Sequence, residues 1–229
     1  MKYIFSSLLI LTLIYSGALK SQNNKKVKKN YKYLLYLPDN YKLQTAEIPL
    51  VIYLHGASCK GSNLNKLKKY GLPYYVNKGR DYNFIIASPQ CPANKSWLSE
   101  NWFEPLYNEL DSKYKIDSKR VYVVGMSMGG YGAWHLAVDY PDKIAAIIPL
   151  CGGCYDSTNI CQISKIPVWA FHGAMDKAIP VDETERLVRI LLDCNAPIKY
   201  SRIENKGHNI ANIFGNQEIY EWLLEHKKQ

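Results

Sequence analysis

Residues 125–129, near the middle of the chain, carry the most specific chemical signal in the sequence. They follow the pattern G-x-S-x-G, in which a serine lies on a sharp turn between a strand and a helix and exposes its hydroxyl as a nucleophile. Glycine at both flanks removes the Cβ atoms that would obstruct such a turn. An apolar run, 120–124, precedes the motif, and a helical pattern, 129–138, follows it. We therefore predict that Ser127 is a catalytic nucleophile.

A serine hydroxyl becomes an effective nucleophile only when a base removes its proton. After a motif of this kind, the partners follow along the chain in the order acid, then histidine. Asp176 comes after the apolar run 168–171, and His208 comes after the run 198–203. We predict that His208 is the general base and then the general acid, and that Asp176 orients its ring and stabilises the imidazolium.

Other acidic and histidine side chains fit these roles less well. The alternative interpretation of Asp176 is that it is an ordinary turn residue. Asp156 lies one loop too early to be the acid. Asp182 is better placed as the cap of a helix over 182–192, where Glu185 would complete a capping box. We expect no direct catalytic role for the remaining histidines, namely His55, His135, His172 and His226.

Hydrolysis through a serine also needs donors for the negative oxygen that develops on the substrate. One donor is expected to be the backbone N–H of Met128, which directly follows the nucleophile. The second should come from the loop after the apolar run 50–54. We predict the N–H of Ala57 for this role, with Ser58 as the alternative, and we expect His55 to brace the loop.

The elements that must position these residues alternate between two kinds of pattern. Apolar runs predict strands, and periodic patterns predict helices: strands at 31–37, 50–54, 84–87, 120–124, 144–148, 168–171 and 198–203, and helices at 106–114, 129–138, 182–192 and 217–225. Continuous apolar strands that alternate with helices are typical of a mostly parallel sheet covered on both faces. Ligands bind such sheets at the carboxyl ends of the strands, where the candidate residues fall.

Length and composition indicate one globular domain of 229 residues with a sizeable core. Residues 1–18 have the pattern of a signal peptide, residues 19–30 form a basic junction, and residues 31–229 form the catalytic domain. The apolar run near the start is shorter than a spanning helix. We expect a periplasmic or secreted protein without stable membrane insertion after cleavage, and retention of the segment as an anchor stays open. Much of the net charge of +9 lies in this leader region, and no nucleic-acid motif accompanies it.

The six cysteines permit disulfides in an exported protein, but six allow 15 full pairings. A bridge between Cys154 and Cys161, across a short polar loop, is the pairing that we expect first. The spacing of Cys151 and Cys154 is also that of a redox or zinc motif, but no second pair of ligands lies nearby in the sequence. We predict neither a metal nor a cofactor.

Several further segments accompany the serine motif and extend over most of the chain after the leader: 49–57, 87–92, 117–120, 125–132, 140–141, 149–153, 167–173 with Asp176, and 207–208. With these segments the chain resembles the α/β-hydrolase superfamily, and within it the small lidless esterases and predicted peptidases. That group includes polyhydroxybutyrate-depolymerase-like and feruloyl-esterase-like proteins and the relatives of dienelactone hydrolase and phospholipase/carboxylesterase. The resemblance implies a three-layer α/β/α sandwich with a mostly parallel central sheet and a Ser-His-Asp triad. Residues 209–212 depart from the predicted-peptidase pattern, so the resemblance does not define the wall of the pocket at this point or the substrate.

The connection between the strands at 144–148 and 168–171 is too short to hold a lid, so we expect an open cleft. Trp97, Trp102 and Tyr155 are candidates to line it together with Ser58, and Trp134 is a further aromatic candidate. An open cleft suits an acyl group displayed on a larger molecule.

The first hypothesis is an exported carboxylic-ester hydrolase that forms an acyl-enzyme, with acetyl or feruloyl esters on carbohydrate among its substrates. The substrate partner is then a small-molecule or polysaccharide-linked ester, and not a nucleic acid. A small serine peptidase of the prolyl-oligopeptidase-like group is the alternative. A catalytically inactive binding module is the third hypothesis.

Overall fold

The computed structural model describes residues 31–228, so the predicted signal peptide (1–18) and basic junction (19–30) lie outside the described residues. The strands are β1 (Tyr33–Tyr36), β2 (Ile48–Leu54), β3 (Ile85–Pro89), β4 (Ile116–Met126), β5 (Ala146–Leu150), β6 (Val168–Gly173) and β7 (Ile198–Ile203). The helices are α1 (Gly71–Asn77), α2 (Phe103–Lys113), α3 (Met128–Asp139), α4 (Asp182–Asp193) and α5 (Glu218–Leu224). Every strand and helix that the sequence predicted has a counterpart among these elements.

The seven strands form one sheet in the order β1-β3-β2-β4-β5-β6-β7. Strand β1 runs antiparallel to β3, and every other neighbouring pair is parallel. Parallel neighbours bring the carboxyl ends of β2, β4, β5, β6 and β7 to the same edge of the sheet. The mostly parallel α/β sheet predicted from the apolar runs is confirmed.

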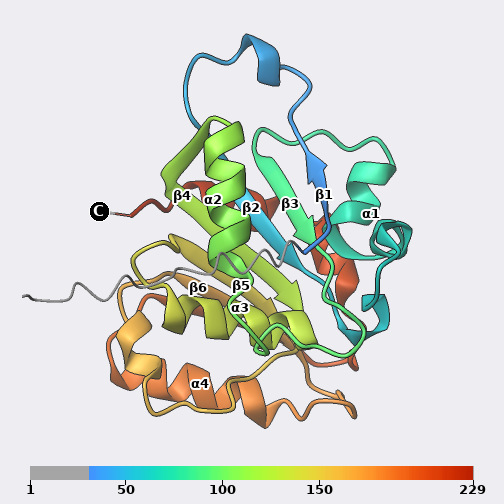
Figure 1. Cartoon of the computed structure of the whole chain (residues 1–229). Coiled ribbons are helices and arrows are strands. Elements are labelled where there is room, and N and C mark those ends of the chain that lie inside the picture. The colour runs from blue at the N-terminus through green and yellow to red at the C-terminus, as the bar shows by residue number, and fades with distance from the viewer. Residues whose placement is uncertain (1–30, 229) are drawn as a thin grey trace, which may run out of the picture.

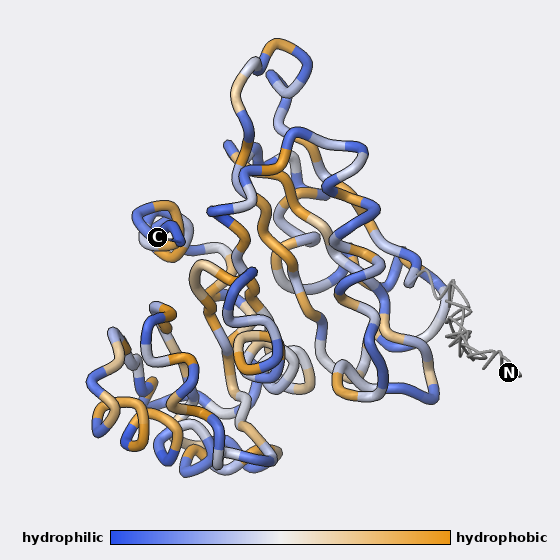
Figure 2. The backbone as a smooth tube through the Cα atoms, turned by 60° about the vertical axis from the view of Figure 1, so that its left-hand side comes forward, coloured by the Kyte–Doolittle hydropathy of each residue, from blue (hydrophilic) through white to orange (hydrophobic). Residues whose placement is uncertain are grey.

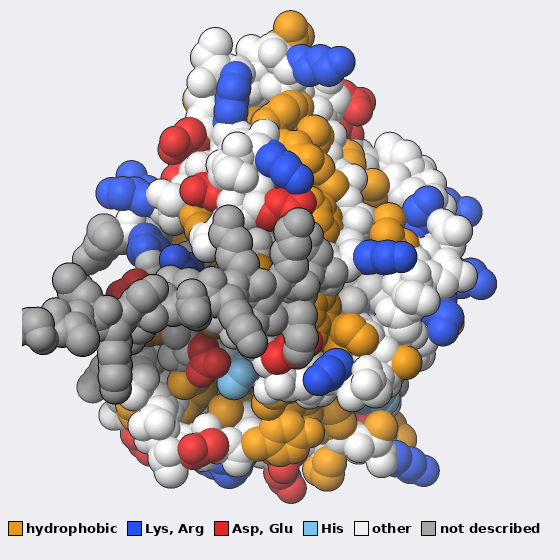
Figure 3. All heavy atoms as spheres, in the orientation of Figure 1, with side chains coloured by type: hydrophobic (Ala, Val, Ile, Leu, Met, Phe, Trp, Pro, Cys, Tyr) orange, Lys and Arg blue, Asp and Glu red, His pale blue; other side chains and the backbone are white. Residues whose placement is uncertain are grey.

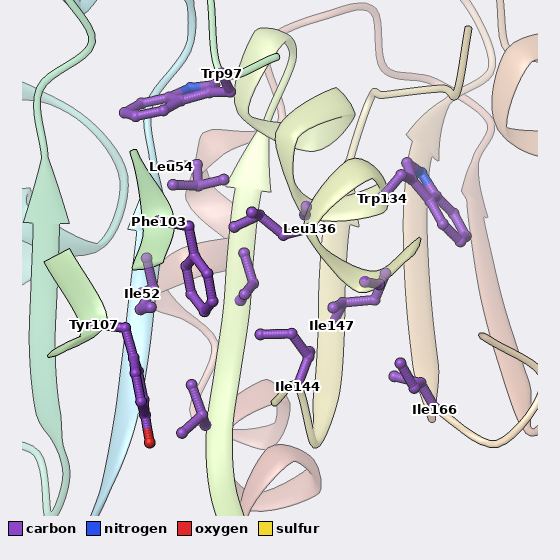
Figure 4. Close-up of a cluster of buried hydrophobic side chains, with 14 of the residues drawn as sticks. Ile52, Leu54, Trp97, Phe103, Tyr107, Trp134, Leu136, Ile144, Ile147 and Ile166 are labelled. Carbon is purple, nitrogen blue, oxygen red and sulfur yellow. The ribbon is translucent and has the colours of Figure 1, made fainter. Parts of the chain in front are cut away.

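Alternate residues of the central strands feed two separate cores. Leu50, Ile52 and Leu54 of β2 pack in the core under α2, α3 and α4, whereas Val51 and Tyr53 pack in the core under α1 and α5. Figure 1 shows the helices layered on the sheet, and Figure 2 shows that the hydrophobic stretches lie along the central strands. The result is the three-layer α/β/α sandwich that the resemblance implied, and Figure 4 shows part of the first core.

Two local predictions differ from the structure. Helix α1 was not predicted, because its seven residues are few, begin with a glycine and include a proline. Helix α4 begins at Asp182, so the preceding Val181 is the cap and makes no side-chain hydrogen bond to the helix. The predicted capping box of Asp182 and Glu185 is therefore wrong, although both carboxylates lie in the first turn, where the helix dipole favours them.

The connection from β5 to β6 spans residues 151–167 and contains the short 3-10 helix η4 (Ile160–Ile163). No lid covers the carboxyl edge of the sheet within residues 31–228, as the length of this connection predicted. Among these same residues no helix is long and apolar enough to cross a membrane. On the face drawn in Figure 3, the visible Lys and Arg side chains are dispersed among acidic and uncharged ones.

A disulfide joins Cys161 to Cys194, whose Cα atoms are 5.9 Å apart. The predicted bridge between Cys154 and Cys161 is therefore wrong. Helix η4 packs against α4, which brings Cys161 to Cys194, the residue directly after α4. The thiol of Cys154 instead donates to the carbonyl of Asp156 at 3.0 Å. The pairing follows tertiary neighbours, and nearness in the sequence did not predict it.

Candidate active site

Ser127 lies between β4 and α3 and has φ 60° and ψ −123°, a left-handed conformation that is strained for a residue with a Cβ atom. The two flanking glycines make this turn possible. A Cβ atom on Gly129 would clash with the carbonyl of Leu54, and one on Gly125 would clash with the carbonyl of Gly129. The backbone of the turn therefore packs directly against β2, and the serine side chain stands at the carboxyl edge of the sheet.

The structure brings Ser127, His208 and Asp176 together in one chain of contacts. Nε2 of His208 lies 2.9 Å from Oγ of Ser127, and Nδ1 lies 2.7 Å from Oδ2 of Asp176. A carboxylate can only accept a hydrogen bond, so Nδ1 carries the proton and Nε2 is free to accept from the serine hydroxyl. The three residues come from the ends of β4, β6 and β7, which the parallel sheet places at one edge.

The carboxylate of Asp176 is fully buried. Two backbone N–H groups and the ring nitrogens of two histidines surround it. Burial alone would raise its pKa, but hydrogen bonds from the N–H groups of Ile179 and Ala178 and from His208 lower the pKa below its usual value. His172 adds a ring nitrogen 3.3 Å from Oδ2. The network keeps Asp176 ionised and fixed beside the imidazole of His208.

His172 forms a second buried layer behind Asp176. Its Nδ1 lies 2.7 Å from the hydroxyl of Thr184, which in turn donates to the carbonyl of Gly152 at 2.6 Å, and its Nε2 lies 3.0 Å from the carbonyl of Ile179. Burial lowers the pKa of His172. The prediction of a structural role for this histidine agrees with its complete burial, and the contact with Asp176 is a feature that the sequence did not reveal.

Cys151, His172 and Asp176 each place one possible metal-ligand atom within 4.8 Å of the others. Two properties make the cluster a poor metal site. Asp176 is already committed to His208 and to two backbone N–H groups. Burial raises the pKa of the Cys151 thiol to about 12, which disfavours the thiolate that binds metals. The group is better described as a buried support for the acid.

The loop after β2 lies directly beside Ser127. A Cβ atom built on Gly56 would be 3.6 Å from Cβ of Ser127, so the loop passes close to the serine just before Ala57. Ala57 opens the 3-10 helix η2 (Ala57–Cys59), and Met128 opens α3. The first N–H groups of a helix have no acceptor within that helix, so both are available to a substrate oxygen. Ser58 is exposed on the same turn.

His55 holds this loop from beneath. Its Nε2 accepts from the N–H of Cys91 at 3.0 Å, so the proton is on Nδ1, which donates to the carbonyl of Gly56 at 2.7 Å. The carbonyl of His55 accepts from the indole N–H of Trp97 at 2.9 Å. Burial lowers the pKa of His55 to about 4, which keeps the ring neutral. The expected bracing role of His55 agrees with these contacts.

The predicted aromatic lining of the cleft needs correction. Trp97 and Trp102 are each only 1% exposed and belong to the core under α2 and α3, and Trp134 is fully buried as well. Figure 4 shows Trp97 and Trp134 among the buried side chains of that core. Trp97 supports the loop at His55, and the indole N–H of Trp102 donates to the carbonyl of Trp97 at 2.8 Å. Buried side chains cannot contact a substrate, and their hydrophobicity explains their position.

Tyr155 is the one predicted aromatic residue that reaches the surface, where it is 79% exposed. Its ring stacks on Tyr131 with the ring centres 4.7 Å apart. Tyr131 lies one turn after Ser127, and its N–H donates to the carbonyl of Ser127. The stacked pair therefore stands on the β5 side of the site, beside a pocket of about 240 Å³.

The alternative acids and bases lie elsewhere. Asp156 accepts hydrogen bonds from Thr158 in an exposed turn, and Asp182 starts α4. His135 pairs with Asp139 at 3.1 Å on α3. His226 is half-buried at the end of the chain, near Trp222.

The fold and the site define the class of protein: the chain has the α/β-hydrolase fold, with a serine on the strand–helix turn and a histidine and an acid after later strands. Residues 99–223 match the family model of phospholipases and carboxylesterases, and the chain belongs to this family. The family of esterases that the sequence resembled is thereby confirmed.

Two curated relatives and one solved structure are similar to this chain. The chain is 29% identical over 126 residues to poly(3-hydroxyalkanoate) depolymerase C of Paucimonas lemoignei, which covers 48% of this chain and 29% of that protein. It is 32% identical over 199 residues to a bifunctional acetylxylan esterase/xylanase of Neocallimastix patriciarum, covering 82% of this chain and 27% of that protein. The crystal structure of a thermostable esterase superposes with a TM-score of 0.72 and 28% identity, over 86% of this chain and 59% of the other.

The chain thus spans less than a third of the length of these two relatives. The likeness supports an ester hydrolase.

Proposed function

We propose that this chain is an exported serine hydrolase that cleaves carboxylic esters through an acyl-enzyme, and that its substrates are acyl groups carried on carbohydrate. The observation that carries the proposal is the position of His208. Its ring bridges Ser127 at 2.9 Å and Asp176 at 2.7 Å while the serine is held in a strained turn. This is the geometry that activation of a serine by a histidine requires.

In the first half of the reaction, the hydroxyl of Ser127 attacks the ester carbonyl and passes its proton to Nε2 of His208. The N–H groups of Met128 and Ala57 hold the negative oxygen that forms. The bond from the carbonyl carbon to the alcohol oxygen then breaks, and His208 gives its proton to the departing alcohol. In the second half, water replaces the alcohol, His208 removes a proton from it, and the acid is released from Ser127.

Three features support an ester of a larger molecule, on the outside of the cell, as the substrate. The site stands at an uncovered edge of the sheet, the leader at residues 1–18 has the pattern of an export signal, and the acetylxylan esterase relative covers 82% of the chain. Acetyl and feruloyl esters of polysaccharide are the substrates that we infer.

Hydrolysis assays with a set of acetyl, butyryl, feruloyl and aminoacyl amide substrates test this proposal. We expect turnover of the esters and little or no turnover of the amides. Ser127→Ala should abolish ester hydrolysis and leave the thermal unfolding temperature unchanged. Cleavage of the amides alone would indicate the peptidase instead, and full activity of Ser127→Ala would refute the assignment of the nucleophile.

A further inference from the structure

A pocket of about 270 Å³ is lined by Asn209, the residue after His208, and is formed by two segments that are far apart in the sequence. Tyr70, Tyr74 and Tyr75 line one side of it, and Asn209 and Asn212 line the other. Helix α1 packs against the 3-10 helix η5 (Ala211–Gly215), so the two sides are joined by contacts of the fold itself. Residues 209–212 are the segment that departs from the predicted-peptidase pattern, and Asn209, Ala211 and Asn212 of this segment form one wall of the pocket.

The aromatic side of the pocket is held in place by contacts beneath it. Gly71 has φ +59°, and a Cβ atom there would clash with the ring of Tyr53, so this turn lets α1 begin directly against the core. Tyr70, just before the turn, is 53% exposed, and Tyr74 is 37% exposed. The ring of Tyr74 meets the ring of Tyr75 edge-on at 5.2 Å. The hydroxyl of Tyr75 donates to the carbonyl of Asn212 at 3.4 Å, which ties the two walls together.

The position of the pocket indicates which part of an ester it would hold. In the proposed reaction, His208 delivers its proton to the oxygen of the departing alcohol, so that oxygen must lie on the His208 side of Ser127. Asn209 is the next residue after His208, and the pocket begins there. An alcohol group that extends from the reacting oxygen on this side would enter the pocket, whereas Tyr155 and Tyr131 stand on the β5 side.

The chemistry of the lining matches a sugar ring. Tyrosine rings offer flat apolar faces together with a hydroxyl, and the exposed amides of Asn209 and Asn212 offer both donors and acceptors. A pyranose ring has apolar C–H faces and a rim of hydroxyls, so it can satisfy both kinds of surface at once. A polyester leaving group lacks such a rim of hydroxyls and offers mainly ester carbonyls, which can only accept hydrogen bonds.

We propose that the pocket of Tyr70, Tyr74, Asn209 and Asn212 binds the sugar ring of the alcohol that leaves in the first half of the reaction. The inference rests on the proposed function, because it assigns the leaving-group side from the role of His208. It predicts selectivity for the alcohol: two esters with the same acetyl group should differ in their dependence on this pocket.

The test compares acetylated xylo-oligosaccharide with p-nitrophenyl acetate, whose leaving group is small and flat. For Tyr70→Ala and Tyr74→Ala, we expect the ratio of kcat/KM for the oligosaccharide to kcat/KM for p-nitrophenyl acetate to fall about tenfold, mainly through a higher KM. Tyr70→Phe keeps the ring and should restore most of the ratio. Leu192→Ala, an exposed apolar residue of α4, is the matched control and should leave both rates unchanged.

An unchanged ratio in folded Tyr70→Ala and Tyr74→Ala would overturn the inference, and so would an equal fall for both substrates. Calorimetric titration of Ser127→Ala with unacetylated xylotriose gives a second measurement that does not depend on turnover. We expect binding that Tyr70→Ala weakens, and no binding would contradict the pocket assignment. A failure of the proposed function would give a different result from a failure of the pocket assignment. In that case the hydrolysis of p-nitrophenyl acetate would not depend on Ser127.

Discussion

The two sides of Ser127 are built in opposite ways. Behind the serine, the polar side chains of His55, His172 and Asp176 are fully buried and hydrogen-bonded within the fold. In front of it, the residues that face solvent include large apolar side chains: Tyr70, Tyr74, Tyr155 and Met175.

The difference separates the residues that perform the chemistry from those that select the substrate. Buried polar groups tolerate little change, because each one loses its partner and its solvation when altered. The exposed rim can change without disturbing the fold. We therefore expect variants behind the serine to lower kcat or stability, and variants in front of it to change KM and selectivity.

The largest effect should come from Asp176→Asn. An asparagine cannot hold His208 in the tautomer that accepts the proton of Ser127, so kcat should fall by roughly 10⁴-fold. Asp111→Asn, an exposed acid on α2, is the control and should retain full activity. Rates with p-nitrophenyl acetate measure both variants. A loss of less than tenfold in Asp176→Asn would mean that another acid orients His208.

Gly129→Ala should cost the most stability. The new Cβ atom would clash with the carbonyl of Leu54, and both atoms belong to backbone that is packed in the sheet. We expect the free energy of unfolding to drop by about 3 kcal/mol. Gly56→Ala is the matched variant, since its Cβ would meet Met126 and Ser127 at an ordinary 3.6 Å and should change the unfolding free energy by less than about 1 kcal/mol. Equal stabilities in urea titrations would contradict the tight packing of the turn.

The third effect concerns His55 and appears only as the pH falls below neutral. The unfolded chain takes up a proton on this residue near pH 6.5, whereas the folded protein does so only near pH 4. Stability should therefore decline as the pH falls through this window, by about 3 kcal/mol from His55 alone. In His55→Gln the decline should be smaller by that amount. Denaturant unfolding from pH 7 to pH 4 measures the difference, and parallel curves for wild type and His55→Gln would contradict the buried neutral ring.

Sequence reasoning succeeded where local pattern determines the structure. The apolar runs predicted the strands, and the G-x-S-x-G motif with its flanking elements predicted the turn at Ser127. It failed where long-range packing decides. The burial of Trp97 and Trp102 and the bridge from Cys161 to Cys194 depend on which elements meet in space. Helix α1, which forms a wall of the pocket beside His208, was missed because its short pattern follows no simple period.

The most direct test of the account is the formation of a covalent bond at Ser127. Intact-mass measurement after treatment with a fluorophosphonate should show one adduct per chain in the wild type and none in Ser127→Ala, and peptide mapping should place the adduct on Ser127. An unmodified wild-type chain, or the same adduct in Ser127→Ala, would contradict the assignment of Ser127 as the nucleophile.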